Sequence, residues 1–211
     1  MVGNRKLGDG GGSALRFTRV GDRIEWTTEV GELTAFEPSV AEVTAYAVEL
    51  AVGYNEPTNA SLMGHTEALE VEEIVEHYAD MAEAGARQFL LFRDGGIAGD
   101  ADLRGIRNGT AEFAFMIGAR AVQGKGLGTR FALMINAFGF TQLGLHRIYA
   151  SLVPHNTASR RVFEKLGYTV DDSPEAREYA DEPNDLTMAI DRATFESFHQ
   201  AQLAQIRISE R

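Results

Sequence analysis

Seven consecutive residues near the middle of the chain combine glycines with hydrogen-bond donors. The residues are Gln123, Gly124, Lys125, Gly126, Leu127, Gly128 and Thr129. Glycines allow a backbone to come close to a bulky anion, and the unpaired N–H groups of a first helical turn point toward such an anion. Because the helix dipole adds to this attraction, the segment is predicted to bind a pyrophosphate, with side-chain donors from Gln123 and Lys125.

Two other phosphate-binding motifs do not fit this glycine segment. A Walker loop requires four residues between its first glycine and a Gly-Lys pair that is followed by Ser or Thr, and that spacing is absent. A dinucleotide-binding fingerprint requires Gly-x-Gly-x-x-Gly within a βαβ unit, whereas here the glycines run Gly-x-Gly-x-Gly after an antiparallel meander. A tight strand-to-helix turn that binds no ligand stays open as the alternative.

The elements that must position the glycine segment are predicted on both sides of it. Before it, turns at Asp94-Gly95-Gly96 and Asn108-Gly109 connect three strand-like runs into an antiparallel meander. After it, apolar spacing indicates alternating helices and strands. The predicted elements are strands at 88–92, 97–103 and 110–117, a helix from the glycine segment onward, a strand at 147–153, a helix at 156–166, an extended piece at 168–170, a strand at 186–190 and a helix at 193–208.

The first third of the chain is predicted to contain a hairpin and two helices. In order, these are strands at 14–20 and 23–30 joined by a turn at Gly21-Asp22, a helix at 39–52, a loop at 55–65 and a helix at 71–84. No linker or internal repeat divides the chain. Residues 14–211 are therefore predicted to form one α+β domain after a flexible, Gly-rich leader at 1–13.

Two motifs in register point to a known family. Gln123–Gly128 resembles the Gln/Arg-x-x-Gly-x-Gly/Ala pyrophosphate loop of the general-control-related N-acetyltransferase (GNAT) superfamily. Asn156–Tyr168 is similar to that family's Asn-x-x-Ser…Glu-Lys-x-Gly-Phe/Tyr helix. The likeness covers about residues 110–170, and the second motif resembles most the branch that acetylates ribosomal-protein N-termini. The acidic first third, which would select the acceptor, has no such match.

The resemblance implies a mixed, mostly antiparallel central sheet that is flanked by helices and splayed at the acetyl-CoA site. The splay would leave the end of the 110–117 strand free to pair with the pantetheine amides, as an added strand would. Acetyl-CoA is therefore the expected co-substrate, and no metal is expected. The implied acetyl-CoA contacts are Phe115, Met116, Ile117, Asn156, Ser159 and the seven residues of the glycine segment, Gln123 to Thr129.

Two side chains are candidates for catalysing attack of an amine on the thioester. Glu112 lies on the strand that leads to the thioester, and apolar neighbours would raise its carboxyl pKa, so we predict that it acts as general base through a water. Positioning of the acceptor and pairing with an arginine stay open for Glu112. Ser159 is predicted to donate to the leaving thiolate, or else to bond its own helix backbone. Many relatives place a Tyr acid four residues further along, where this chain has Phe163.

Charge is distributed unevenly along the chain. The formal net charge is −11, yet the stretch between Arg23 and Arg87 contains fourteen acidic residues and no Lys or Arg. The remaining residues hold 20 basic and 17 acidic groups. Such a field repels nucleic acid and attracts cations. The acidic residues are either solvated helix faces or a surface that guides a cationic acceptor.

These observations predict an acetyltransferase for a primary amine, with a cationic acceptor favoured. A polyamine, an aminoglycoside-like antibiotic, an aminoacyl compound and a protein N-terminus are the acceptor classes that fit. The alternative is a non-catalytic acyl-CoA-binding or regulatory module. The chain has no cysteine, no secretory signal and no apolar run long enough to span a bilayer, so a cytoplasmic protein without membrane or nucleic-acid partners is expected. Its oligomeric state stays open, with a homodimer among the alternatives.

Overall fold

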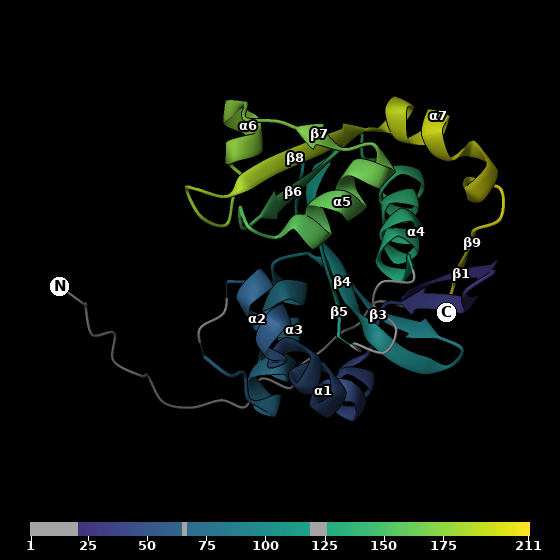
Figure 1. Cartoon of the computed structure of the whole chain (residues 1–211). Coiled ribbons are helices and arrows are strands. Elements are labelled where there is room, and N and C mark those ends of the chain that lie inside the picture. Colours follow the sequence, from purple (N-terminus) through teal and green to yellow (C-terminus); the bar gives the residue numbers. More distant parts are fainter. Residues whose placement is uncertain (1–20, 65–66, 119–125) are drawn as a thin grey trace.

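The computed structural model of the chain describes residues 21–64, 67–118 and 126–211 (Figure 1). The predicted leader at 1–13 and the predicted strand at 14–20 lie outside the described residues. So do three residues of the glycine segment, Gln123, Gly124 and Lys125.

Two strands, three helices and three strands come first among the described elements, and helices and strands alternate after them. The strands are β1 (Asp22–Thr28), β2 (Gly31–Phe36), β3 (Arg87–Arg93), β4 (Gly96–Arg107), β5 (Thr110–Ile117), β6 (Arg147–Leu152), β7 (Thr169–Val170), β8 (Leu186–Asp191) and β9 (Arg207–Glu210). The helices are α1 (Val40–Tyr54), α2 (Pro57–Leu62), α3 (Val71–Glu83), α4 (Leu127–Thr141), α5 (Thr157–Leu166), α6 (Pro174–Arg177) and α7 (Arg192–Leu203).

The described strands form one mixed sheet in the order β7-β8-β6-β5-β4-β3-β2-β1-β9. β5 and β6 are parallel, and the other pairs of described strands are antiparallel. This architecture confirms the predicted α+β fold with a mostly antiparallel central sheet flanked by helices.

Side-chain alternation along the central strands builds a core on each face of the sheet. Phe89 and Leu91 of β3 belong to the core that contains α4, where Phe89 meets Phe138 edge-on. Leu90 and Phe92 point the other way and join the core that contains α1 and α3. The two faces are therefore covered by different helices, with α1, α2 and α3 grouped apart from α4 and α5 (Figure 1).

The sheet divides between β5 and β6. These strands pair only where Thr110–Glu112 lies opposite Arg147–Tyr149. Beyond this point β5 continues along β4 while β6 continues along β8, so the two halves of the sheet diverge. The divergence confirms the predicted splay, and it exposes the edges of both strands to a common space.

Two local predictions were wrong. The predicted loop at 55–65 contains α2, which Pro57 begins and the Glu56 side chain caps. The partners of β1 among the described strands are β2, with which it forms a hairpin, and β9 on its other edge. The closing helix ends at Leu203 because the following residues extend to form β9, where Ile208 lies opposite Ile24 and packs on the core.

Candidate functional site

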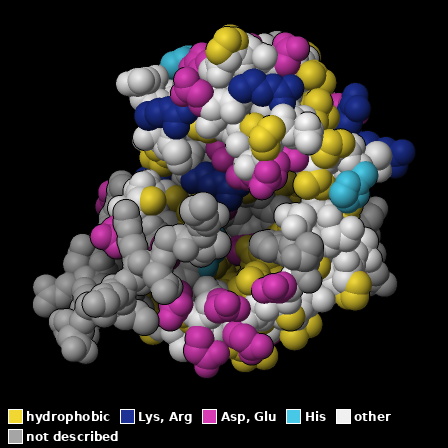
Figure 2. Space-filling view, turned by 90° about the vertical axis from the view of Figure 1, so that its left-hand side faces the viewer, with side chains coloured by type: hydrophobic (Ala, Val, Ile, Leu, Met, Phe, Trp, Pro, Cys, Tyr) yellow, Lys and Arg dark blue, Asp and Glu magenta, His cyan; other side chains and the backbone are white. Residues whose placement is uncertain are grey.

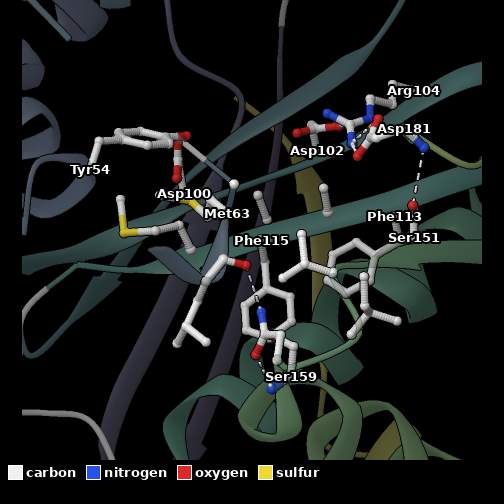
Figure 3. A pocket seen from close by; sticks show the side chains of 18 of the residues that line it. Tyr54, Met63, Asp100, Asp102, Arg104, Phe113, Phe115, Ser151, Ser159 and Asp181 are labelled. Atoms are coloured by element: carbon white, nitrogen blue, oxygen red, sulfur yellow. Dashed lines mark hydrogen bonds and ion pairs between the residues drawn. The ribbon is translucent and has the colours of Figure 1, made fainter. Parts of the chain in front are cut away.

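A cavity of about 490 Å³ lies where β5 and β6 diverge. Side chains from β4, β5, β6, α3, α5 and the segment 181–185 line it. Figure 3 shows Asp102, Arg104 and Asp181 together at one end, Tyr54 beside Asp100 at the other, and Ser159 on the α5 side. Polar groups from several elements thus converge on the divergence of the sheet.

Two glycines shape the start of α4, the part of the glycine segment that the structure describes. Gly126 precedes the helix with a φ of 75°, a left-handed conformation that favours glycine. A Cβ on Gly128 would lie 3.3 Å from the Phe115 ring, so glycine there lets the helix start lie close to β5. The Leu127 side chain is buried in the core. Leu127 and Thr129 therefore present first-turn backbone N–H groups, the donors that a helix start offers to an anion.

The end of β5 carries the predicted pantetheine contacts. Phe115, Met116 and Ile117 lie beyond the point where β5 leaves β6, and their described strand partner is β4. At Phe115 and Met116, the edge that faces away from β4 has no partner strand among the described residues, so it can pair with an extended ligand. Phe115 and Met116 line the cavity, and Ile117 packs against the core that contains α4.

The start of α5 brings Asn156 and Ser159 to the cavity wall. The Asn156 side chain caps the helix by accepting from the Ser159 N–H (2.9 Å), and it donates to the Leu62 carbonyl (3.0 Å). Asn156 therefore joins α5 to α2. The Ser159 hydroxyl makes no hydrogen bond to a described residue, so the alternative in which it bonds its own helix is not the arrangement found. Phe163 is buried against Phe113 and Phe115.

Asp100 is the first of two aspartates on β4 that line the cavity. Neither aspartate was among the predicted site residues. Asp100 is buried and accepts hydrogen bonds from the hydroxyls of Tyr54 (2.8 Å) and Tyr78 (2.9 Å). Burial raises the pKa of Asp100 to about 6, although these two hydrogen bonds oppose the rise.

Asp102 lies two residues further along the same face of β4. Burial raises the pKa of this carboxyl to about 7; the charge of Arg104 opposes the rise and nearby carboxylates add to it. The Asp102 side chain is only 17% exposed, and its Oδ1 has no hydrogen-bond partner among the described residues. A cavity-lining carboxylate that titrates near neutral pH is suited to accept a proton.

Glu112, the predicted general base, is paired with an arginine. Both of its carboxylate oxygens accept from the Arg104 guanidinium, at 2.9 and 2.8 Å. Its side chain is 7% exposed and does not line the cavity. Burial raises the Glu112 pKa and the Arg104 pairing opposes the rise. Arginine pairing, one of the alternatives that the sequence left open, is what the structure shows.

A sequence signal for the two aspartates existed. Asp100 and Asp102 stand at alternate positions of a run that is otherwise small or apolar, so they share one face of the strand next to the predicted pantetheine strand.

Glu73 and His77 of the acidic first third also line the cavity. Figure 2 shows acidic side chains above and below a hollow on this face of the molecule. Among the described residues, no group of three or more His, Cys, Asp or Glu side chains is placed so that it could hold a metal ion. No described helix is long and apolar enough to cross a membrane.

Comparisons with known proteins give a family and a fold. The family described as acetyltransferase (GNAT) domain matches residues 34–169. The spermidine N(1)-acetyltransferase of Escherichia coli (strain K12) is 34% identical over 122 residues, which are 54% of this chain and 63% of that protein. The match thus spans somewhat less than two thirds of this curated relative's length.

Two solved structures share the fold at low sequence identity. RimJ of Mycobacterium smegmatis, in complex with CoA-disulfide, has a TM-score of 0.68 and 16% identity over 88% of this chain and 96% of its own. The spermidine N-acetyltransferase of Vibrio cholerae, in complex with CoA and spermine, has a TM-score of 0.62 and 20% identity over 77% of this chain and 97% of its own. Since the family match covers more than half of the residues and includes the divergent strands, the chain belongs to the acetyltransferase (GNAT) domain family.

Proposed function

We propose that the chain is an acetyl-CoA-dependent N-acetyltransferase that modifies a primary amine on a cationic acceptor, by direct attack in a ternary complex. One observation carries the proposal: Asp102, a carboxyl with a pKa near neutral, lines the same cavity as Phe115 and Ser159 at the divergence of the sheet. The family match and the names of the relatives, which include a spermidine N(1)-acetyltransferase, support it.

The residues around the divergence fit acetyl-CoA. Gly128 leaves room beside β5, because a Cβ at this position would press on Phe115. The first-turn N–H groups of α4 would bind the pyrophosphate. The edge of β5 that faces away from β4 would pair with the pantetheine amides at Phe115 and Met116, with Ile117 beside them, while Asn156 and Ser159 would lie beside the arm. Gln123, Gly124 and Lys125 would complete the pyrophosphate contacts. Acetyl-CoA supplies the acetyl thioester that the amine attacks.

Asp102 is the proposed general base. In its ionised form it would take a proton from the acceptor ammonium, which frees the lone pair that forms the new C–N bond. As the C–S bond breaks, the Ser159 hydroxyl would donate to the departing sulfur, and a second amine proton would ultimately restore the thiol as free CoA. Much of the remaining rate would come from holding the two substrates together, which is worth on the order of 7–11 kcal/mol in favourable cases.

Glu112 stays a second candidate for the base, but its geometry makes it the weaker one. The two hydrogen bonds from Arg104 oppose the rise that burial causes in the pKa of Glu112, and proton uptake would break that pairing. Glu112 would then act indirectly, by holding Arg104 beside Asp102 and Asp181.

A thiol-release assay with acetyl-CoA tests the proposal. The panel of acceptors contains polyamines, aminoglycosides, amino acid amides and short basic peptides, and neutral amines serve as controls. Release of CoA with one cationic class would support the transferase and name its acceptor, and Asp102→Asn should abolish most of that release. An absence of release across the panel, with tight acetyl-CoA binding by calorimetry, would instead favour the alternative of a non-catalytic acyl-CoA-binding or regulatory module. A cytoplasmic location and a homodimer stay predictions.

A further inference from the structure

One wall of the cavity lies beyond the part of the chain that the family match describes. Residues 34–169 match the family, whereas Asp181, Glu182 and Asp185 come from the connection between α6 and β8. This connection faces the strand that carries Asp102, and Figure 3 shows Asp181 beside Arg104 and Asp102. Membership of the family therefore says nothing about what this wall binds.

The wall is held firmly to the sheet. The ring of Tyr179 stacks on Tyr149 with 4.7 Å between centroids, and the Tyr179 hydroxyl is 2.7 Å from that of Thr110. Glu178 forms an ion pair with Arg107 at 2.9 Å. A wall fixed by several contacts presents its charges in one arrangement, so a ligand loses less free energy in ordering it.

Asp185 is an unusual carboxylate within this wall. The residue is 6% exposed and lines the cavity, yet among the described residues its carboxylate accepts a hydrogen bond only from the Ser151 hydroxyl, at 3.1 Å. It forms no ion pair with any described residue. The Arg177 guanidinium contacts the Asp185 backbone carbonyl (2.7 Å), which fixes the position of the residue without neutralising its charge. Buried carboxylates ordinarily have a cationic partner, because desolvating an unpaired charge is costly.

The cavity as a whole carries more negative than positive charge. Asp100, Asp102, Asp181, Glu182 and Asp185 line it, together with Glu73. Arg104 is the described arginine in the lining; it is hydrogen-bonded to Glu112 and Asp181, and it lies 3.8 Å from Asp102. The Oδ1 atom of Asp102 is buried without a hydrogen-bond partner among the described residues. The lining therefore has enough unbalanced negative charge to bind more than one added positive charge.

We infer that the acceptor carries a second ammonium group, and that Asp185 binds it while Asp102 receives the amine that reacts. The inference rests on the proposed function for the role of Asp102, and it adds a specificity-determining residue and a substrate class, the diamines and longer polycations. A second ammonium would give the buried Asp185 carboxylate the cationic partner that it lacks among the described residues.

Calorimetric titration of the protein–CoA complex tests this subsite without any need for turnover. Diaminoalkanes of increasing length are compared with n-alkylamines of matching length. The wild-type protein should bind the best-fitting diamine at least about tenfold more tightly than the matched monoamine, which is the strength of one charged hydrogen bond. Equal affinities for diamine and monoamine would overturn the inference, whether or not any variant folds.

Two variants assign the effect to one residue. Asp185→Asn keeps the shape and the bond from Ser151 but removes the charge, so the preference for the diamine should disappear while monoamine binding stays the same. Asp172→Asn is the matched control, because it makes the same change at an exposed position that does not line the cavity and should leave the preference intact. A diamine preference that survives in Asp185→Asn would refute the assignment. Thiol release is measured in parallel: diamine binding without release for any amine would refute the proposed transferase and leave the subsite standing.

Discussion

The replacement Asp102→Asn tests the proposed chemistry most directly, because it removes the proton acceptor and preserves the shape. With a pKa of about 7 for Asp102, kcat/KM of the wild-type protein should rise about tenfold between pH 6 and pH 8 and then level. The acceptor ammonium, with a pKa of about 10, stays protonated over this range. If only the rare neutral amine reacted, kcat/KM would instead rise about a hundredfold and would not level. The two mechanisms therefore differ in how steeply kcat/KM rises with pH.

In Asp102→Asn the levelling near neutral pH should disappear, and kcat/KM at pH 8 should fall by a factor of about 10² or more, the usual contribution of a general base. The assay is initial-rate thiol release at saturating acetyl-CoA over pH 5 to 9, with the acceptor identified in the panel. A variant that keeps both the levelling and more than half of the wild-type rate would refute Asp102 as the base.

The same replacement has a consequence for stability that does not depend on activity. The folded-state pKa of Asp102 is raised. Its favourable contribution to the free energy of unfolding is therefore present below the ordinary Asp pKa and is lost as pH rises through about 7. The free energy of unfolding is measured by urea titration at pH 5 and at pH 8. It should fall less between these two pH values in Asp102→Asn than in the wild-type protein. Equal losses would show that Asp102 is not desolvated as described.

Three further replacements separate the roles of the other site residues. Ser159→Ala should lower kcat about tenfold with little change in the KM for acetyl-CoA, and an unchanged kcat would remove the hydroxyl from the chemistry. Gly126→Val should weaken CoA binding by at least about tenfold in calorimetry, because a φ of 75° is unfavourable for a β-branched residue; unchanged affinity would contradict the pyrophosphate assignment. Glu112→Gln should lower the unfolding free energy by about 1.5–3 kcal/mol in urea titrations, the range for hydrogen bonds to charged groups, since it weakens the two-bond pairing with Arg104, while most turnover remains. A loss of turnover as large as that of Asp102→Asn would return the base role to Glu112.

The acetyl-CoA half of the site could be predicted from the sequence because its determinants are local. Glycines at the start of α4 and the cap at the start of α5 act through backbone conformation within a few residues, so their spacing is visible in one segment. The meander of β3, β4 and β5 was predictable for the same reason, since tight turns connect its strands. The pairing of β9 with β1 was not, because residues nearly the whole chain apart form it.

The acceptor half could not be predicted, because its chemistry depends on contacts between distant elements. Glu112 and Asp102 look alike in sequence, but in the structure Glu112 accepts two hydrogen bonds from Arg104, whereas Asp102 lies 3.8 Å from Arg104 without a hydrogen bond to it and lines the cavity. Asp185 lies in a polar connection that resembles an ordinary surface loop. Its burial arises from Ser151 and Arg177, which the fold brings beside it.

The alternation of side chains along β4 has a consequence for how such an enzyme could change. Ala101 and Leu103 face the core that contains α4, whereas Asp100 and Asp102 face the layer of α1 and α3. One strand thus separates a side that would hold the common acyl donor from a side that would select the amine. Exchanging α1 to α3, or the connection between α6 and β8, would alter the second side and leave the first in place. New acceptor specificities could then arise by replacing peripheral segments around an unchanged donor site.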